Sequence, residues 1–404
     1  MTIHSDYSVI RVGIAGTGFI ARRLFDSCRL MDDLQASIVL TRRAFDSIEG
    51  VPPGVPLTQS TQELIDNSDV VVECSGDPVH AAEVVRDVLA AGLRVVTMDS
   101  EFHVTCGSHF VGKGYLTEAH GDQPGVLAQL RDELVGMGFE PLVYGNMKGF
   151  LNPNPSRKDM EYWSERQGFR VQQTTSFTDG TKVQIEQALV ANAFAAGIAR
   201  PGLLAPQMDS FEDATRALGE AALELGHPIA DFTVVPGQAP GVFVIATIDE
   251  SQRPVLGALK MGDGPYYTFV RPYHLCALEV PNTIRHAMQG RPPLLHNSTA
   301  PTIGVAAVAK KRLQPGERIE MGIGSYQVRG TAVRFRDEPN HVPIGLLYDA
   351  TIIRAVEPEQ MLTLDDVDLP DSYARDITLE LIREAVSKVT QYSRVLEAGS
   401  VGRR

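Results

Sequence analysis

The chain has 404 residues, more than one ordinary domain contains, and this length predicts two or three domains, each long enough to bury a core. Its 43% hydrophobic and 22% charged residues are typical of a globular protein, and the net charge of −13 argues against nucleic acid or an acidic membrane as a partner. The four cysteines lie far apart in the sequence, which speaks against a zinc knuckle and a disulfide framework.

The N-terminal segment reaches a predicted strand without the basic and apolar regions of a secretion signal. No apolar run approaches the roughly 20 residues that span a bilayer. We therefore expect a cytoplasmic protein without membrane contact.

The first third of the chain alternates short β-branched runs with helical segments, the pattern of an α/β fold with a parallel sheet. The predicted strands cover residues 9–16, 36–42, 69–76, 93–99 and 141–146. These strands predict a doubly wound Rossmann domain over residues 1–150.

A glycine-rich turn follows the first predicted strand and opens a helix. It has the pattern GxGxxA, in which one glycine permits the tight turn, the next admits a pyrophosphate, and Ala21 lets helix and strand pack closely. This pattern predicts a dinucleotide site formed by Gly16, Thr17, Gly18, Phe19 and Ile20.

Two further segments are predicted to touch the dinucleotide. The second strand ends in Arg42 and Arg43 instead of an acidic residue, so two guanidinium groups are available for the 2′-phosphate of NADP. The alternative is that both are solvated surface charges. The loop of Cys74, Ser75 and Gly76 follows the third strand and is expected at the nicotinamide ribose, unless it is only a helix entry.

Three further regions follow. Residues 151–300 begin with a Pro- and Asn-rich linker or lid and predict an α+β catalytic domain, with helices over 182–199 and 211–225 and strands over 241–249 and 266–271. Residues 301–372 contain short strands and turns and predict a small β-rich domain. Residues 373–404 hold a closing helix, expected over 377–396.

The best candidates for a proton donor or base are two lysines in glycine-containing motifs, Lys148 in GNMKG and Lys182 in TDGTK. Glu186 lies one helical turn after Lys182 and is expected to hold its ammonium or take part in proton transfer, unless the two form a surface ion pair. Asp179 is either a helix cap or a ligand of substrate or metal, and Asp122 is more readily a cap than a substrate ligand.

Arg271 lies in the segment RPYH beside Tyr273 and His274. Its guanidinium could bind a phosphate or a carboxylate. We include Arg271 among the candidate catalytic residues, whereas His274 in an apolar segment is more readily a packed side chain.

Five motifs together resemble the SAF-domain homoserine-dehydrogenase-like family, which includes the reductoisomerase-like second type of 1-deoxy-D-xylulose 5-phosphate reductoisomerase. The motifs are RVGIAGTGFIA, HGDQPGV, YGNMKGF, TSFTDGTKVQIEQALVANA and RPYHLCALEVP. The C-terminal segments KKRLQPGERI and MLTLDDVDLP resemble a SAF module.

The resemblance implies an NADP-dependent oxidoreductase that acts on a small polar hydroxy-carbonyl compound and forms a homodimer or another homo-oligomer. Its sharpest form is a reductoisomerase of isoprenoid biosynthesis, which would need a divalent metal such as Mg or Mn to hold vicinal oxygens. Asp179, Glu186 and Glu279 are conceivable ligands, but no spacing assigns a metal site. The alternatives are a homoserine or sugar-acid dehydrogenase and, from another class, a non-catalytic NADP-binding sensor.

Overall fold

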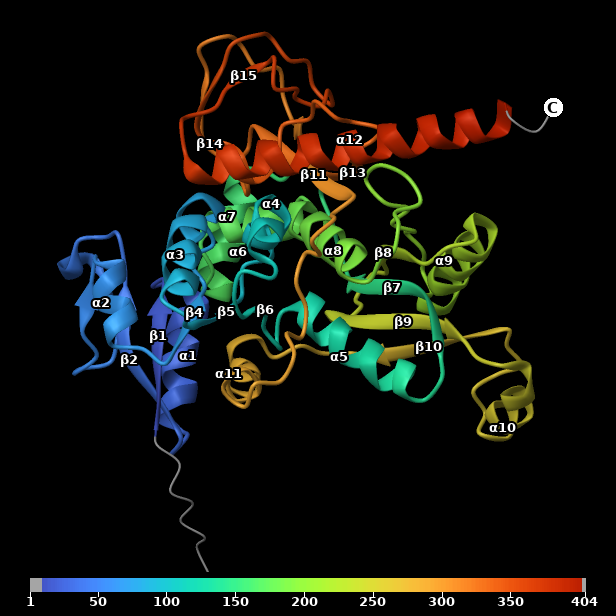
Figure 1. Cartoon of the computed structure of the whole chain (residues 1–404), viewed down its shortest axis with the longest axis horizontal. Coiled ribbons are helices and arrows are strands. Elements are labelled where there is room, and N and C mark those ends of the chain that lie inside the picture. Colours follow the sequence, from blue (N-terminus) through green and yellow to red (C-terminus); the bar gives the residue numbers. More distant parts are fainter. Residues whose placement is uncertain (1–8, 402–404) are drawn as a thin grey trace, which may run out of the picture.

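The computed structural model describes residues 9–401, with side chains described from residue 9 to residue 387. Figure 1 shows the nucleotide-binding sheet at one end, a second sheet at the other, and the C-terminal elements across one side. No helix of the described part is long and apolar enough to cross a membrane.

The N-terminal domain is built on a six-stranded parallel sheet in the order β3-β2-β1-β4-β5-β6, the strand order of a Rossmann domain. Its strands are buried and rich in valine, as expected for a sheet covered on both faces. The elements are β1 (Ile10–Ala15), α1 (Phe19–Arg29), β2 (Leu34–Leu40), β3 (Leu57–Thr58), α2 (Thr61–Asp66), β4 (Val70–Glu73), α3 (Pro78–Ala90), β5 (Arg94–Thr97), α4 (Ser100–Thr105) and β6 (Leu116–Glu118).

The second sheet has four strands in the order β10-β9-β7-β8, with β7 parallel to β8 and antiparallel to β9. The helices α5 and α8 contribute to the large core on one face, whereas α9 packs on the other face through Leu218 and Ala222. The elements are α5 (Gln123–Gly136), β7 (Glu140–Lys148), α6 (Arg157–Gln167), α7 (Val171–Thr178), α8 (Thr181–Ala193), α9 (Phe211–Leu225), β8 (Ile229–Val234), β9 (Gly241–Thr247), α10 (Arg253–Ala258), β10 (Tyr266–Arg271) and α11 (Val280–Met288).

The C-terminal region is rich in short strands, as predicted. It forms a two-stranded sheet, β11-β13, and a three-stranded sheet, β12-β14-β15, and α12 crosses the molecule beside them (Figure 1). The elements are β11 (Ile303–Ala309), β12 (Arg318–Met321), β13 (Val328–Arg334), β14 (Tyr348–Ile352), β15 (Val367–Asp368) and α12 (Tyr373–Val401). Short 3-10 turns occur at Phe45–Ser47, Gly107–Phe110, Glu250–Gln252, Cys276–Leu278 and Ile344–Leu346.

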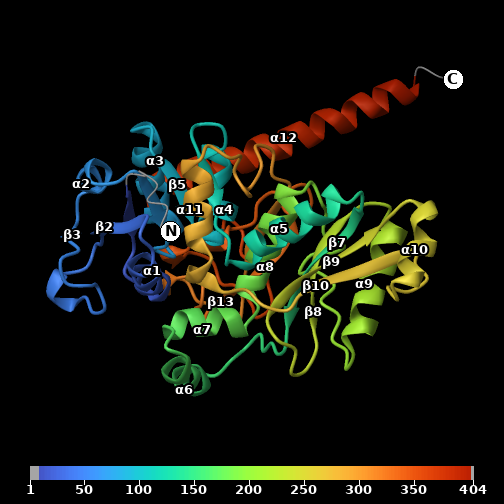
Figure 2. The ribbon, with the colours of Figure 1, turned by 90° about the horizontal axis from the view of Figure 1, so that it is seen from below.

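Three expectations need correction. The strand predicted over 141–146 pairs with β8 and β9 in the second sheet, so the nucleotide-binding sheet ends at β6. The helix predicted over 182–199 ends at Ala193, because Ala195 has a left-handed backbone and Gly197 pairs with Ile229. The stretch after the proline-rich linker contains two unpredicted helices, α6 and α7, and Figure 2 shows them near α1.

Candidate functional site

The glycine-rich turn has the geometry that a dinucleotide requires. Gly16 has a φ of +128°, and a Cβ there would lie 2.8 Å from the carbonyl oxygen of Cys74. The helix α1 begins at Phe19, and no side chain caps its first turn, which leaves amide groups available for a phosphate. All five predicted loop residues, Gly16, Thr17, Gly18, Phe19 and Ile20, lie in this turn and at the start of α1.

The two arginines after β2 have different surroundings. Arg42 donates from Nη2 to Oδ2 of the buried Asp77 at 2.5 Å, while Oδ1 of Asp77 accepts from the Val79 and His80 amides and caps α3. Arg43 is exposed, and within the described chain its guanidinium has no carboxylate partner. Arg43 is therefore the freer of the two to meet a 2′-phosphate.

The loop after β4 lies against the glycine-rich turn, because a Cβ on Gly16 would meet the backbone of Cys74 and Ser75. Its backbone is held by Glu73, whose Oε1 accepts from the Ser75 amide at 2.9 Å. Burial raises the pKa of Glu73 to about 7 and the pKa of the Cys74 thiol far above its ordinary range. Cys74 is thus a neutral, buried thiol at the start of the loop, and the backbone of Ser75 and Gly76 remains available to a ribose.

Lys182 lies in the first turn of α8 against the carboxyl edge of the nucleotide-binding sheet, with 11% of its side chain exposed. Its Nζ donates to Ser100 Oγ at 2.7 Å and to Glu101 Oε2 at 2.9 Å, and lies 3.8 Å from Asp122 Oδ2. Ser100 Oγ in turn donates to Asp122 Oδ2 at 3.3 Å. A hydrogen-bonded line therefore runs from an ammonium through a hydroxyl to a carboxylate.

Glu186 does not contact the Lys182 ammonium directly, although its charge helps to raise the Lys182 pKa. Glu186 Oε2 accepts from Asn146 Nδ2 at 2.8 Å and lies 3.7 Å from Lys148 Nζ. Lys148 also donates to Gln123 Oε1 at 3.0 Å. Glu186 thus contacts the second candidate lysine. The two lysine clusters are neighbours, since Asp122 lies near Lys182 and the adjacent Gln123 accepts from Lys148.

The charges of this site are set by burial and by neighbours. Burial lowers the pKa of Lys182, but Asp122, Glu101 and Glu186 outweigh it, so the pKa is raised well above its ordinary value. Burial raises the pKa of Glu186 to about 7, although Lys148 opposes the shift. Lys182 is consequently an ammonium at neutral pH, whereas Glu186 changes charge there.

Two predicted residues lie in other contacts. Asp179 is buried and pairs through Oδ2 with Lys310 Nζ at 2.6 Å, while its Oδ1 accepts from the Thr181 amide. Arg271 pairs with Glu279 at 2.5 Å and also bonds Gln129. Asp179 therefore joins the start of α8 to the C-terminal region, and the charge of the Arg271 guanidinium is already balanced by Glu279.

The segment after β10 reaches the lysine clusters through a close backbone contact. A Cβ on Gly121 would overlap the carbonyl oxygen of Cys276, so only glycine fits there. His274 Nδ1 lies 3.0 Å from the Gly121 carbonyl oxygen, which agrees with a packed histidine. Burial raises the pKa of Cys276 to about 11. Cys276 therefore borders the site as a neutral thiol.

The sequence interpretation missed Ser100, Glu101 and a layer of buried acids beneath them. Asp99 and Glu118 end or follow neighbouring strands of the sheet, and burial raises both pKa values far above the ordinary range. His103 Nε2 lies 3.4 Å from Glu118 Oε2, and burial lowers the His103 pKa to about 3. The position of MDSE directly after a parallel strand was the available signal, because ligands gather at that edge.

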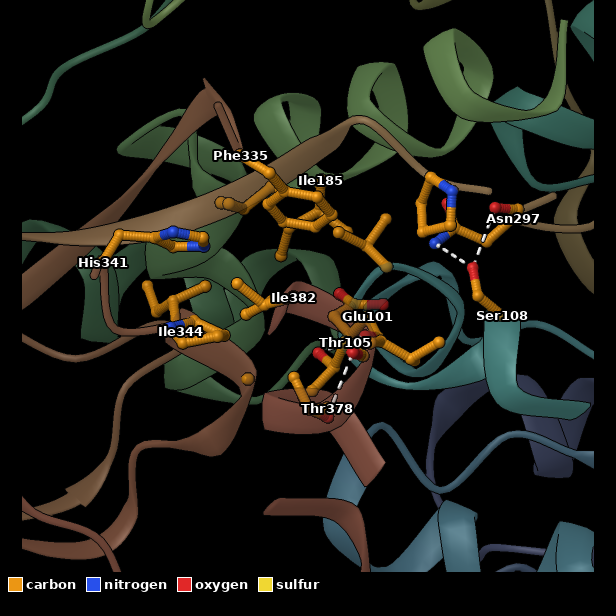
Figure 3. Close-up of a pocket in the computed structure, with 17 residues that line it drawn as sticks. Glu101, Thr105, Ser108, Ile185, Asn297, Phe335, His341, Ile344, Thr378 and Ile382 are labelled. Carbon is orange, nitrogen blue, oxygen red and sulfur yellow. Dashed lines mark hydrogen bonds between the residues drawn. The ribbon is translucent and has the colours of Figure 1, made fainter. Parts of the chain in front are cut away.

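A mostly apolar pocket on the other side of Glu101 lies among α4, α8, α12 and the β-rich region. In Figure 3, Ile185, Phe335 and Ile382 line it, and the hydroxyl of Thr378 on α12 donates to the Thr105 carbonyl at 3.1 Å. These contacts hold α4 and so position Glu101 for Lys182.

The carboxylates considered for a metal do not converge. Asp179 pairs with Lys310, Glu186 with Asn146 and Lys148, and Glu279 with Arg271. In the part of the chain that the structure describes, no group of three or more His, Cys, Asp or Glu side chains is arranged to hold a metal ion. The residues present therefore do not fit the expected divalent metal.

Comparisons with known proteins give two family matches. Residues 121–280 match the family model described as the catalytic domain of oxidoreductase DRL, and residues 16–103 match the NAD-binding domain of homoserine dehydrogenase. No curated protein sequence matches the chain significantly.

Solved structures show distant likeness. A probable dehydrogenase from Thermotoga maritima has 13% identity and a TM-score of 0.45, covering 71% of this chain and 91% of its own. A UDP-N-acetylglucosamine 3-dehydrogenase from Acidithiobacillus ferrooxidans has 14% identity and a TM-score of 0.42, covering 71% and 92%. A biliverdin reductase from Synechocystis, in complex with biliverdin and NADP+, has 15% identity and a TM-score of 0.36, covering 71% and 93%.

The two family matches meet at the site described above. The NAD-binding match contains the glycine-rich turn, Ser100 and Glu101, and the oxidoreductase match contains Asp122, Lys148 and Lys182. The expected likeness to homoserine dehydrogenase is confirmed for the NAD-binding domain. The chain is an NAD(P)-dependent oxidoreductase.

Proposed function

We propose that the protein is an NADP-dependent reductase of a small polar carbonyl compound that carries hydroxyl groups. The observation that carries the proposal is Lys182, a partly buried ammonium held by Ser100 and Glu101 on α4, the helix that follows β5. In a Rossmann domain the ligand lies at the carboxyl ends of the strands where the strand order reverses, beside β1 and β4. Lys182 reaches this edge from the second domain.

The residues present fit a nicotinamide dinucleotide. Gly16 and Gly18 give a phosphate close access to the backbone, and Arg43 is free for the 2′-phosphate. Bound NADPH would supply the hydride. The protein must then neutralise the alkoxide that develops at the carbonyl oxygen.

Lys182 is suited to give that proton. Its pKa is raised well above the ordinary lysine value, so it stays charged through neutral pH and can stabilise the negative charge that develops on the substrate oxygen as the proton is transferred. Ser100 and Asp122 form the line through which the lysine can regain a proton.

Lys148, Asn146 and Gln123 are suited to bind the substrate's hydroxyl groups. The three side chains share hydrogen bonds around Glu186 and Gln123 Oε1, and Lys148 remains partly exposed. Several hydrogen-bond donors and acceptors so close together are suited to bind a compound with several hydroxyl groups. A non-catalytic sensor would not need such a buried polar cluster beside the nicotinamide.

The reductoisomerase interpretation is the sharper form of the proposal and stays a prediction. It needs a divalent metal on vicinal oxygens, and the candidate carboxylates lie in separate contacts. A homoserine or sugar-acid dehydrogenase remains the alternative within the same reaction class.

The test is a screen that follows the absorbance of NADPH with hydroxy-aldehydes, hydroxy-ketones, sugar phosphates and amino-acid semialdehydes. We expect oxidation of NADPH by at least one hydroxy-carbonyl compound, faster than with NADH. Analysis of the carbon skeleton of the product separates simple reduction from reductoisomerisation. NADPH binding without turnover across the panel would favour the sensor.

A further inference from the structure

Arg170 of the second domain reaches the glycine-rich turn of the first. A Cβ built on Gly18 would lie 3.9 Å from Nη2 of Arg170. The neighbouring Phe169 packs on Phe19 at the start of α1, with ring centroids 4.7 Å apart, and on Phe177 of α7 at 5.5 Å. Two aromatic contacts therefore hold the segment before α7 over the turn.

The charges around Arg170 are of the same sign. Burial, Arg43 and Arg22 all lower its pKa, in that order, and Tyr348 opposes them. Across the described residues, none of the three guanidinium groups has a carboxylate within 4.0 Å. Arg170 thus lies at the glycine-rich turn within electrostatic reach of Arg22 on α1 and Arg43 after β2, and all three side chains are exposed to solvent.

Like charges repel, so such a grouping is unfavourable in the free protein and becomes favourable when an anion lies among them. The second glycine of a GxGxxA turn is the point where a dinucleotide pyrophosphate approaches the backbone, and Arg43 follows the strand beside which the adenosine ribose lies. The anion that fits both positions is a phosphate group of the dinucleotide.

We propose that Arg170 binds a phosphate group of the dinucleotide, together with Arg22 and Arg43, so that the catalytic domain contributes directly to cofactor affinity. This inference rests on the proposed NADP-dependent function and adds to it a residue from outside the nucleotide-binding domain. Two phosphate groups fit the chemistry, the pyrophosphate beside Gly18 and the 2′-phosphate beside Arg43.

The test compares the dissociation constants of NADPH and NADH for the parent, Arg170→Ala and Arg170→Lys, measured by the fluorescence of the reduced nicotinamide without substrate. We expect Arg170→Ala to weaken NADPH about tenfold or more, the size expected for losing a charge-assisted contact. Arg170→Lys should recover part of the affinity, because it keeps the charge but not the planar fork. Arg166→Ala is the matched control, since Arg166 lies on α6 and bonds to Tyr162.

The NADH arm assigns the phosphate. A loss confined to NADPH supports a 2′-phosphate contact, and equal losses for both cofactors support a pyrophosphate contact. Unchanged affinity for both cofactors in Arg170→Ala overturns the inference. Equal affinities of the parent for NADPH and NADH would reject the proposed NADP preference but not the role of Arg170. In that case Arg170→Ala must still weaken the binding of both cofactors if Arg170 binds the pyrophosphate. Unfolding temperatures separate a lost contact from a misfolded variant.

Discussion

Lys182 and Lys148 are predicted from the glycines around them, and the structure shows why a sequence cannot supply their partners. Glu186 is one turn from Lys182 on the same helix, yet Ser100 and Glu101, from the nucleotide-binding domain, make the short contacts. Helical spacing places two side chains on the same face of a helix. It does not determine which residues of another domain will contact them once the domains pack together. Long-range contacts of this kind depend on the fold.

Arg42 and Arg43 illustrate the same limit at the surface. The sequence predicts that both clamp a 2′-phosphate, but Arg42 is engaged by Asp77, the N-cap of α3. The sequence alone does not indicate that Asp77 contacts Arg42. The two side chains meet because β2 and β4 lie on either side of β1 in the sheet.

We predict that Arg43→Ala weakens NADPH binding about tenfold or more and leaves NADH binding nearly unchanged, because a charge-assisted contact to the 2′-phosphate is lost. Arg42→Ala should have the smaller effect, since Arg42 must first leave Asp77. Isothermal titration with both cofactors measures this. Arg29→Ala, at the exposed far end of α1, is the control. An unchanged NADPH affinity in Arg43→Ala would exclude the assignment.

Among the elements, helices are predicted well where the sequence itself marks their ends with capping residues. The helix expected over 211–225 has these bounds because Ser210 caps the Asp213 amide and Gly226 takes the left-handed conformation. The helices α6 and α7 escape prediction because a proline- and asparagine-rich stretch precedes them and their apolar residues are few. The strand β7 is recognisable in the sequence, but its sheet is not, because strand pairing is a long-range property.

The helix α8 carries a testable pH dependence. Glu186 has a pKa near 7 in the folded chain against an ordinary value of 4.5, so the folded state holds its proton more tightly than the unfolded state. Ionising Glu186 therefore reduces the stability as the pH rises from about 4.5 to about 7. Glu186→Gln keeps an acceptor for Asn146 but removes this titration.

Urea denaturation of the parent and Glu186→Gln at about pH 5 and about pH 8 measures the effect. The free energy of unfolding of the parent should fall relative to the variant as the pH rises, by at most about 3 kcal/mol. The matched control is Glu212→Gln, in the exposed first turn of α9. Parallel stabilities at both pH values would show that Glu186 titrates normally.

At the scale of the whole molecule, the three parts share one buried interior. Lys310 at the end of β11 pairs with Asp179 beside α8, with side-chain exposures of 4% and 0%. Lys310 also donates to the Ser325 carbonyl at 2.7 Å. This pair fastens the C-terminal region to the catalytic domain. The SAF-like character of that region and the homo-oligomeric state stay predictions.

We expect Lys310→Met to lower the free energy of unfolding by roughly 3 to 5 kcal/mol, because it leaves the Asp179 charge buried without a partner. Lys310→Met combined with Asp179→Asn should recover part of that loss. Chemical denaturation provides the measurement, and Lys311→Met, an exposed neighbour, is the control. If Asp179 acted in catalysis instead, Asp179→Asn would abolish turnover in molecules that remain folded.

The measurement that tests the account most directly is the turnover of NADPH by Lys182→Met with a substrate found in the screen. The change keeps most of the side-chain length and removes the proton, so NADPH binding should survive while turnover falls by roughly 100- to 10,000-fold. Lys311→Met should turn over like the parent. Near-normal turnover in Lys182→Met, with NADPH bound normally, would contradict the account and move the proton donor to Lys148.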